Sequence, residues 1–392
     1  MVFCKYTLIM LSFKRCSNNK NKVNYKMIPI NDLSRGYSLY GREYEEKAIE
    51  VLRSGWYILG KEVEEFEKEY AEALGGNCYC ASVDNGLDAI TIGLKASGIK
   101  PNDEVIVQAN GYIATMLGIM QCGAVPVFVE PDEYYQLDYK NIEPAITDKT
   151  KAVLVTHLYG LATRMDNIIE ICKKNNLMLF EDCAQSHFAP YKGVNTGLFG
   201  DASFFSFYPT KNFGGYGDGG GIISKNPDII KKAKVLRNYG SDYRYHNIEI
   251  GYNARLDELQ AGLLRIKLKH IKDLLNNRDH IAQRYLKEIK NPLVELPRTP
   301  KGCKHTWYQF IVRVDNQEKF REHMKNNDIA TDISWKVPPY LQPAMIEKFG
   351  YKRGNFPITE KICDTIVSLP MMDYMEEDEI QKVIDGVNNY AG

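Results

Sequence analysis

Hydrophobic and polar positions alternate along the middle of this chain with the two periods that distinguish strands from helices. Five short runs rich in β-branched residues are separated by longer stretches in which apolar residues recur every three or four positions. This order of strand and helix predicts a mostly parallel sheet with helices on both faces. The expected strands are Cys78 to Val83, Glu104 to Ala109, Val125 to Val129, Ala152 to His157 and Leu177 to Glu181.

The pattern changes after this region. Two further strands, Ala202 to Phe207 and Gly220 to Ser224, follow each other too closely for a crossover helix, so we expect at least one of them to run antiparallel. Helical spacing then predicts separate helices from Arg255 to Asn276 and from His280 to Glu288. We therefore expect an α/β fold with two domains. The large domain would cover residues 27–250, and a smaller C-terminal α+β domain would cover residues 251–392.

Composition narrows the class of partner. The chain has 392 residues, 44% of them hydrophobic and 26% charged, which is typical of a globular protein with two domains that share a cleft. Lys plus Arg and Asp plus Glu both number 50, so no net charge favours nucleic acid or an anionic membrane. A small molecule is the more reasonable partner.

The nine cysteines favour the cytoplasm. Their number is odd and none has C-x-x-C spacing, so we expect reduced thiols and no metal site. Cys78 and Cys80 would share one face of a strand, but two ligands without further partners are a weak metal signal.

Residues 1–26 differ from the rest of the chain. A short apolar run, Tyr6 to Phe13, is followed by a stretch rich in Asn and Lys, and the run is too short to span a bilayer. We expect a dispensable extension, with the folded protein beginning near Met27. Deleting residues 1–26 would then leave activity and solubility unchanged.

The most informative stretch lies between Phe180 and Gly221. It places Asp182 at the end of one expected strand and Lys211, 29 positions later, beyond the end of another. Pyridoxal phosphate (PLP) needs this pair, because a lysine amine condenses with its aldehyde and an aspartate keeps its pyridine nitrogen protonated. Taken alone, Asp182 is more simply a structural acid that caps the following turn.

Three weaker signals fall at the same edge of the expected sheet. The turn Ser82 to Ala89 joins a strand to a helix and is a plausible phosphate site, although Asn-Gly often serves a turn alone. Tyr112 follows another strand and is suited to stack on a flat cofactor, with a core tyrosine as the alternative. Ser206 is equally compatible with binding phosphate and with an ordinary strand position.

One glycine pattern is misleading. Gly215 to Gly220 matches G-x-G-x-x-G, but it precedes a strand and does not join a first strand to a helix, so it does not indicate a nicotinamide cofactor. We expect these glycines to form tight turns around the lysine loop.

Several segments together resemble the DegT/DnrJ/EryC1/StrS nucleotide-sugar aminotransferases, in order and from about Asp32 to the C-terminus. The matching segments are Glu181 to His187, Gly200-Asp201, Ser206 to Asn212, Gly217 to Gly220 and Gly251 to Ala261. The resemblance implies the aspartate aminotransferase (type I) fold, PLP as cofactor and a homodimer with active sites at the subunit interface.

The same resemblance assigns roles to residues. It implies that Lys211 forms the Schiff base and that Asp182 pairs with the pyridine nitrogen. Gln185 would lie against the cofactor ring and Tyr112 would stack on it. The phosphate would be held by the main chain of Gly86 and Leu87, by Ser206, and by Asn253 of the second subunit.

Two comparisons with the family's motifs bear on the reaction. The family usually has Pro-Ala-Asn-Thr-Tyr where this chain has Gln108 to Tyr112, so the side chain missing at Gly111 removes any threonine contact there. Some members replace the lysine with histidine and perform dehydration. Since position 211 is Lys, transamination is favoured.

Sub-branch motifs indicate the substrate. Asn85 to Ala89, Tyr112 to Thr115 and Arg255 to Gln260 resemble the C-3 aminotransferases of dTDP-3-oxo-6-deoxyhexoses. The expected reaction gives a dTDP-3-amino-3,6-dideoxyhexose with L-glutamate as amino donor, in O-antigen or other surface-glycan biosynthesis. The alternatives are a C-4 aminotransferase of a UDP- or GDP-4-keto-6-deoxy sugar and a non-catalytic, regulatory PLP-binding module.

Candidate substrate contacts rest on position alone. Trp56 and Tyr57 lie in a turn between the expected helices Tyr40 to Leu52 and Lys61 to Ala73, near the expected dimer cleft. His187 and Tyr208 flank the cofactor residues. Each of the four is as readily explained by packing.

Overall fold

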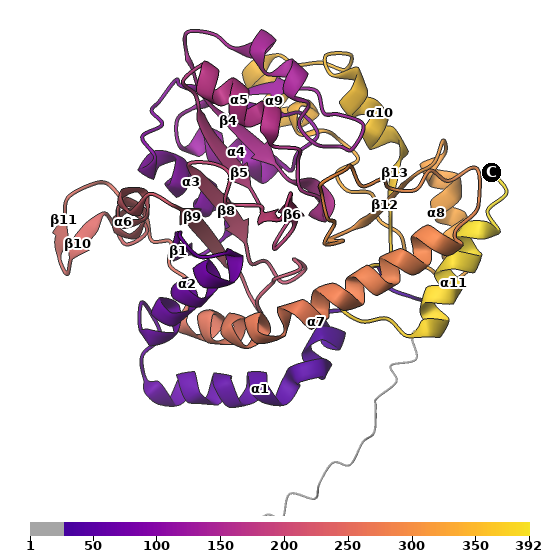
Figure 1. The fold of residues 1–392 in the computed structure, drawn as a ribbon, viewed down its shortest axis with the longest axis horizontal. Coiled ribbons are helices and arrows are strands. Elements are labelled where there is room, and N and C mark those ends of the chain that lie inside the picture. The colour runs from indigo at the N-terminus through magenta and orange to yellow at the C-terminus, as the bar shows by residue number, and fades with distance from the viewer. Residues whose placement is uncertain (1–26) are drawn as a thin grey trace, which may run out of the picture.

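A computed structural model of the chain describes residues 27–392, so the expected extension lies outside the described residues. Its centre is a seven-stranded sheet in the order β1-β9-β8-β5-β4-β2-β3 (Figure 1). All the strands run parallel except β9, which is antiparallel to both of its neighbours. The expected mostly parallel sheet with one reversed strand is therefore confirmed. The strands are β1 (Tyr79–Val83), β2 (Glu104–Gln108), β3 (Val125–Val129), β4 (Thr150–Thr156), β5 (Met178–Asp182), β8 (Ala202–Ser206) and β9 (Gly220–Ser224).

Helices cover both faces of this sheet, as the hydrophobic pattern predicts. One face packs against α3 (Gly86–Ala96), α4 (Ile113–Gln121) and α6 (Pro227–Leu236) through residues such as Leu154, Phe180 and Phe204. The opposite face packs against α2 (Lys61–Leu74), α5 (Asp166–Lys174) and the first half of α7 (Glu258–Glu288). Successive residues of each strand point to opposite faces of the sheet. The neighbouring side chains of Glu181 and Asp182 in β5 therefore lie on different faces.

The helix α7 is one continuous element of 31 residues, not the two helices that we expected. Its first half packs on the large sheet, and its second half contributes Ile281 and Tyr285 to the core of the C-terminal domain. In Figure 1 it runs below the sheet from one domain to the other. Polar residues between Asn276 and His280 suggested a break, but continuous packing along the helix keeps it intact.

The C-terminal domain is built on the antiparallel pair β12 (Phe310–Arg313) and β13 (Ile366–Leu369). The N-terminal segment joins it, because Ile28 pairs with Ile329 and is buried in the core of that domain. The first described residues therefore pack on the C-terminal domain, although we expected them in the large domain. The other helices are α1 (Leu33–Ser54), α8 (Gln317–Asn326), α9 (Pro343–Phe349), α10 (Pro357–Thr365) and α11 (Glu377–Asn388), and the remaining strands are β6 (Pro190–Tyr191), β7 (Val194–Asn195), β10 (Ser241–Tyr243) and β11 (His246–Asn247).

Candidate active site

The carboxyl ends of adjacent strands bring the expected chemistry to one edge of the sheet. Asp182 is the last residue of β5, and Ser206 is the last residue of its neighbour β8. Lys211 follows Ser206 by five positions, in the turn that leads back to β9. Ligands of open α/β sheets bind beyond these strand ends, so the sheet order alone brings the acid and the lysine to one cleft.

Asp182 is buried and held by two donors. Its Oδ2 accepts a hydrogen bond of 2.6 Å from the Thr115 hydroxyl, and its Oδ1 accepts one of 3.1 Å from the backbone N–H of Ala184. Burial raises the pKa of Asp182, whereas Thr115, the Ala184 N–H and the positive charge of Lys211 lower it. A carboxylate in this setting has a strong preference for a cationic partner such as a protonated pyridine nitrogen.

Lys211 lies over an aromatic ring that the sequence did not single out. Its Nζ is 4.6 Å from the centre of the Tyr308 ring. Burial raises the pKa of Tyr308, but the charge of Lys211 and hydrogen bonds with Thr210 and Lys211 outweigh burial, and the net shift is downward. Tyr308 stands just before β12, almost 100 residues after Lys211, and no local pattern marks it.

The start of α3 forms the expected phosphate cradle. The side chain of Asn85 caps the helix by accepting from the Asp88 N–H at 2.8 Å, which leaves the N–H groups of Gly86 and Leu87 without intrahelical partners. A Cβ at Gly86 would lie 2.7 Å from the Ser206 Cβ. Glycine allows this close approach, and the same Cβ would lie 3.2 Å from the Ser206 Oγ, so the start of α3 lies directly beside the Ser206 hydroxyl. The residues present therefore fit a phosphorylated pyridine cofactor.

Gln185 and Tyr112 complete the side of the cleft. Gln185 is buried, and its Oε1 accepts from the Tyr159 N–H at 2.8 Å, which leaves its amide N–H groups as the donors for a ligand. Tyr112 precedes α4 and is 49% exposed at the mouth. Thr115 lies on the first turn of the same helix, so α4 supplies both the exposed ring and the donor to Asp182. In the sequence, Thr115 stands out only as part of a sub-branch motif. Its role as the donor to Asp182 was not predicted.

The structure puts His187 below the site and not on its surface. The side chain is fully buried, Nδ1 bonds with the Tyr70 hydroxyl at 2.8 Å, and Nε2 bonds with the Ser206 carbonyl oxygen at 2.9 Å. Burial lowers the pKa of His187 to about 3, so the ring is neutral. These contacts correct the expectation that it touches a sugar and favour the packing alternative.

The other candidate contacts are on the surface. Trp56 and Tyr57 are exposed in the turn after α1. Their polar side-chain atoms donate to nearby carbonyl oxygens, Trp56 to Ile58 in the same turn and Tyr57 to Leu52 at the end of α1. Tyr208 is half exposed beside the lysine turn. Asn253 is exposed, and its main chain pairs with that of Asn238. Tyr208 contacts the lysine turn through its main chain, because its carbonyl oxygen accepts from the Lys211 N–H at 2.9 Å. That bond shapes the turn and involves no side chain, so the roles of the four side chains toward sugar and phosphate stay predictions.

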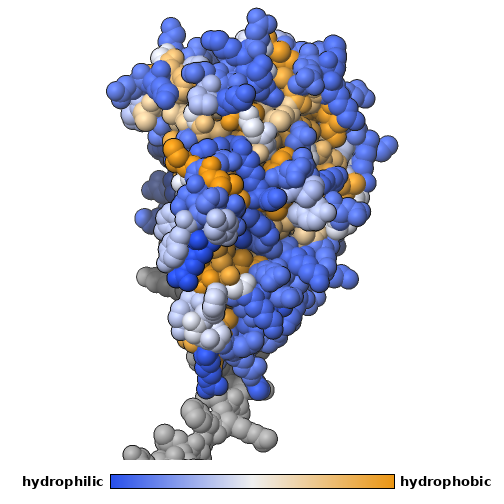
Figure 2. All heavy atoms as spheres, turned by 90° about the vertical axis from the view of Figure 1, so that its left-hand side faces the viewer, coloured by the Kyte–Doolittle hydropathy of each residue, from blue (hydrophilic) through white to orange (hydrophobic). Residues whose placement is uncertain are grey.

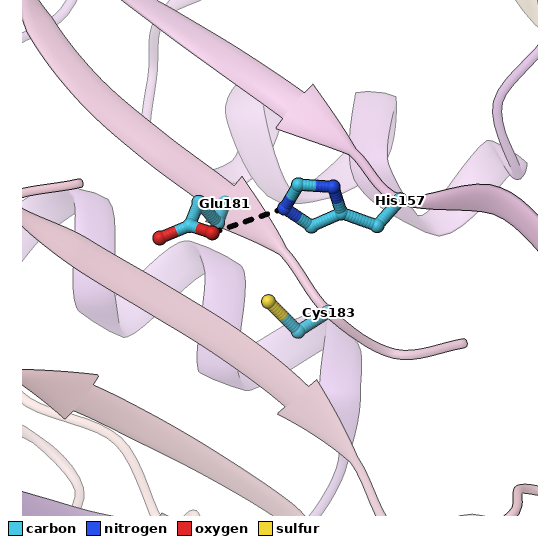
Figure 3. Close-up of side chains that lie close together, drawn as sticks. All are labelled: His157, Glu181 and Cys183. Atoms are coloured by element: carbon cyan, nitrogen blue, oxygen red, sulfur yellow. Dashed lines mark hydrogen bonds and ion pairs between the residues drawn. The ribbon is translucent and has the colours of Figure 1, made fainter. Parts of the chain in front are cut away.

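A second polar group lies on the opposite face of the same strands. Figure 3 shows His157, Glu181 and Cys183 pointing toward one another, with ligand atoms within 4.8 Å, a spacing that would suit a metal ion. The bonds already formed leave little capacity for one. The Nε2 of His157 lies 3.0 Å from Glu181, and its Nδ1 accepts from the Thr163 N–H, while burial raises the pKa of the Cys183 thiol well above its usual range. These contacts favour a structural role.

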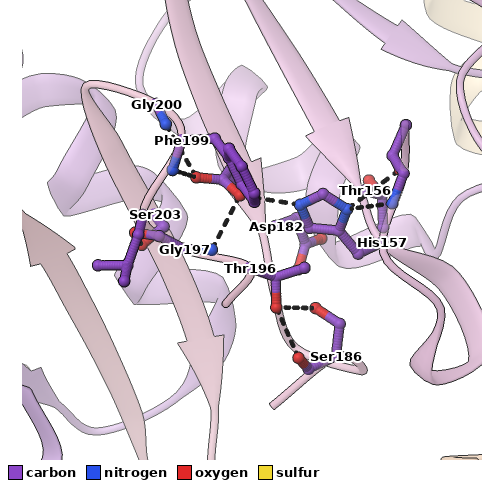
Figure 4. Close-up of polar contacts among 12 residues, drawn as sticks. Thr156, His157, Asp182, Ser186, Thr196, Gly197, Phe199, Gly200 and Ser203 are labelled. Atoms are coloured by element: carbon purple, nitrogen blue, oxygen red, sulfur yellow. Dashed lines mark hydrogen bonds and ion pairs between the residues drawn. The ribbon is translucent and has the colours of Figure 1, made fainter. Parts of the chain in front are cut away.

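Glu181 holds the loop between β7 and β8. Its two carboxylate oxygens accept three backbone N–H groups, from Gly197, Phe199 and Gly200, at 2.8 to 2.9 Å. Figure 4 shows Gly197, Phe199 and Gly200 of the loop on one side of this group of contacts and His157 on the other. With His157 as a fourth donor, the carboxylate fixes the loop that leads into β8, the strand ending at Ser206.

The comparisons with known proteins agree with this arrangement. The sequence model of the DegT/DnrJ/EryC1/StrS aminotransferase family matches residues 40–388 of this chain. The chain belongs to this family. It is therefore a PLP-dependent aminotransferase of nucleotide sugars, with the type I fold that the resemblance implied.

One curated relative and two solved structures are especially similar to the aminotransferase. A dTDP-3-amino-3,6-dideoxy-alpha-D-galactopyranose transaminase from Aneurinibacillus thermoaerophilus is 45% identical over 366 residues, covering 93% of this chain and all of the relative. The X-ray structure of S. venezuelae DesV in complex with a ketimine intermediate matches with a TM-score of 0.90 at 37% identity, covering 92% of this chain and 98% of DesV. The structure of ntda from Bacillus subtilis with bound cofactor PMP matches with a TM-score of 0.86 at 28% identity, covering 94% and 86% of the two chains.

Within residues 27–392 of the aminotransferase, we find no helix with the length and apolar character that crossing a membrane requires.

Proposed function

We propose that the aminotransferase moves the amino group of L-glutamate to C-3 of a dTDP-3-oxo-6-deoxyhexose and so makes a dTDP-3-amino-3,6-dideoxyhexose. The observation that carries this proposal is the 45% identity, over the full length of the relative, to a transaminase named for such a product. The sub-branch motifs at Asn85 to Ala89, Tyr112 to Thr115 and Arg255 to Gln260 support the same choice. The product would serve O-antigen or other surface-glycan biosynthesis in the cytoplasm.

The proposed chemistry assigns one task to each residue of the cleft. When bound, PLP supplies an aldehyde that carries the amino group and a ring that accepts electrons. Lys211 would hold the cofactor, and its amine, when free, would accept the proton from the donor α-carbon. Its conjugate acid returns a proton to C-3 of the sugar in the second half of the reaction. Tyr308, beside the amine, orients Lys211 for both transfers.

The remaining contacts hold the cofactor in place. Asp182, fixed by Thr115, keeps the pyridine nitrogen protonated. Tyr112 stacks on one face of the ring, and Gln185 donates from its free amide. The N–H groups of Gly86 and Leu87 bind the phosphate with Ser206, at the positive end of α3.

We also propose a homodimer in which Asn253 of one subunit reaches the phosphate of the other. The support is a set of exposed apolar side chains in two segments, the turn after α1 and the stretch around β10 and β11. Figure 2 views the side of the molecule on which Figure 1 places β10 and β11, and hydrophobic patches lie between polar residues on that side. So many large apolar side chains exposed in two short segments are typical of a surface that another protein covers. The set comprises Leu52, Trp56, Tyr57, Ile58, Tyr239, Tyr243, Tyr245, Ile248 and Ile250.

The experiment is to incubate the PLP-loaded enzyme with glutamate and a panel of dTDP-, UDP- and GDP-linked 3-keto and 4-keto sugars. NMR of the product identifies the aminated carbon. Amination of C-3 on a dTDP sugar is expected. Activity only on a UDP- or GDP-4-keto sugar refutes the C-3 assignment but not the transaminase reaction, and no absorbance change with glutamate supports the non-catalytic alternative.

A further inference from the structure

The Tyr112 ring at the mouth of the site is held by a side chain of the C-terminal domain. Trp335 lies in the segment between α8 and α9, and its ring centre is 5.5 Å from that of Tyr112, at an interplanar angle of 41°. Its Nε1–H also donates to the main-chain carbonyl oxygen of Asn110 at 3.0 Å. One indole therefore contacts both ends of the turn from Asn110 to Tyr112, from which α4 begins.

The same indole supports the Gln185 side of the cleft. It stacks on the Tyr159 ring at 6.1 Å and 16°, and the Tyr159 N–H donates to the Oε1 of Gln185. Tyr159 and Trp335 have φ values of +62° and +41°, which large side chains rarely adopt. Such conformations persist only where the surrounding structure imposes them, and they cluster at functional sites.

The Asn110 end of the turn is held by its own side chain, which donates to the Tyr135 carbonyl oxygen at 2.9 Å and accepts from Gln108 at 3.1 Å. The central residue, Gly111, has no side chain to hold the turn toward Tyr112. A Cβ at this position would lie 3.2 Å from the Cε of Met116 and 3.8 Å from the Oγ1 of Thr156. Among residues 27–392, that buried hydroxyl has no hydrogen-bond partner. A side chain at position 111 would have given this part of the turn contacts of its own, so the position of the Tyr112 ring depends more on Trp335.

Trp335 is in turn fixed to its own domain. Asp332 and Ser368 exchange two backbone hydrogen bonds, of 3.3 and 2.8 Å, which join the segment to β13. The Ser334 hydroxyl donates to the Gln309 side chain at 2.9 Å. The indole therefore transmits the position of the C-terminal domain to the cofactor side of the large domain.

We propose that Trp335 is a positioning residue for the cofactor: it sets the orientation of the Tyr112 ring and of the turn from Asn110, and so couples the C-terminal domain to cofactor binding. This inference rests on the proposed contact between Tyr112 and the ring of PLP. Trp335 itself acts through Tyr112 and Asn110 and need not touch the cofactor.

A double-variant cycle tests the coupling. The cofactor-free wild type, Y112A, W335A and Y112A/W335A are titrated with PLP, and the dissociation constant is measured by absorbance. The loss of two ring contacts and a hydrogen bond predicts that W335A binds PLP roughly tenfold more weakly than wild type. In the Y112A background the same change should weaken binding by less than about threefold, since most of the effect passes through Tyr112.

W335F removes the Nε1 donor and keeps a smaller aromatic ring, so it remains informative if W335A fails to fold. It should weaken binding by about threefold and alter the visible circular dichroism of the bound cofactor, which reports ring orientation. Phe349, a half-buried ring at the end of α9 that packs against the core of the large sheet, provides the control: F349A should leave both readouts unchanged.

The outcomes separate the two proposals. Wild-type affinity in Y112A refutes the proposed contact of Tyr112, and this inference with it. Weaker binding in Y112A, together with wild-type affinity and dichroism in W335A or W335F, refutes the role of Trp335 alone. Equal effects of W335A in both backgrounds refute its action through Tyr112.

Discussion

The environment of single side chains determines how the cleft performs acid–base chemistry. Asp182 would be too easily protonated in a buried position if burial acted alone. The Thr115 hydroxyl, the Ala184 N–H and the charge of Lys211 each lower its pKa. Burial has the larger effect, so the net shift of the pKa is upward, and these neighbours limit that rise. A cationic ring beside the carboxylate would lower the pKa further and so favour the charged form.

The substitution Thr115→Val tests this balance. It keeps the shape of the side chain but removes the 2.6 Å bond to Asp182, so the pKa of Asp182 should rise further. We expect the glutamate half-reaction to slow by about tenfold, and the acid limb of its pH profile to move to higher pH. Stopped-flow absorbance measures both. T115S keeps the hydroxyl and should behave like wild type, and an unchanged acid limb in T115V would contradict the role of Thr115.

A second carboxyl gives the fold itself a pH dependence. Burial and the neighbouring Asp88 carboxylate raise the pKa of Asp84 to about 7. The folded state thus holds this proton up to about pH 7, whereas the unfolded chain releases it near pH 4. The contribution to stability is complete below about pH 4 and is lost as the pH rises to about 7.

Asp84→Asn should remove this dependence. The free energy of unfolding of the cofactor-free variant, measured in urea between pH 4 and 8, should change less with pH than that of wild type. The difference between the two proteins should grow from pH 4 to pH 7 and then level off. Parallel curves would show that Asp84 has an ordinary pKa.

At the scale of elements, the start of α3 must approach β8 closely enough for its N–H groups and Ser206 to share a ligand. Gly86→Ala puts a Cβ 2.7 Å from the Cβ of Ser206. Alanine normally stabilises a helix position relative to glycine, so destabilisation here would come from the close approach alone. We expect a loss of about 1–3 kcal/mol in the free energy of unfolding and at least about tenfold weaker binding of PLP.

The variant G86A/S206G provides the matched control. Removing the Ser206 side chain relieves the contact, so most of the lost stability should return in chemical denaturation, although PLP binding stays weak without the hydroxyl. Equal stability of G86A and wild type would show that a Cβ at position 86 fits beside Ser206 without a steric clash.

The loop between β7 and β8 depends on one carboxylate. Glu181→Gln replaces an acceptor with an NH2 group that faces N–H donors, and we expect a loss of about 2–4 kcal/mol in the free energy of unfolding. Hydrogen exchange should accelerate at the amides of Gly197, Phe199 and Gly200. The same change at the exposed Glu347 should have no effect, and unchanged exchange in E181Q would contradict the role of Glu181.

The elements and the pair of Asp182 and Lys211 could be predicted because each follows from nearby residues. A segment of ten to twenty residues is enough to predict each strand, the turn before α3 and the reversed direction of β9. Contacts between segments that are far apart in the sequence cannot be predicted in this way. Tyr308 and Trp335 reach the cleft from the C-terminal domain through packing that no local period records, and the burial of His187 depends on Tyr70 of α2.

At the scale of the whole molecule, α7 and the segment that begins at Met27 connect the two domains. Large apolar side chains nevertheless remain exposed on the surface. Ile250 is 88% exposed, and it stands three residues before Asn253. Asn253 is expected to bind the phosphate of the other subunit, and an exposed apolar side chain close to it is typical of an interface. Both features agree with a symmetric dimer in which each subunit contributes Asn253 to the active site of its partner.

Mixing two defective proteins tests that exchange. K211A lacks the amine, and N253D places a negative charge where the partner's phosphate would lie, so each should be inactive alone. After exchange of subunits, one site in each mixed dimer has Lys211 from one chain and Asn253 from the other. Random pairing then predicts recovery of about a quarter of the wild-type specific activity.

The control is a mixture of K211A with K211A/N253D, in which every site lacks the lysine and no activity should return. Native mass spectrometry verifies that mixed dimers have formed. If they form without recovery, Asn253 does not act across the interface, because an intact pair of Lys211 and Asn253 would then be present in each mixed dimer without supporting the reaction. If N253D is fully active alone, the phosphate is held without Asn253, and the free N–H groups of α3 with Ser206 must bind it unaided.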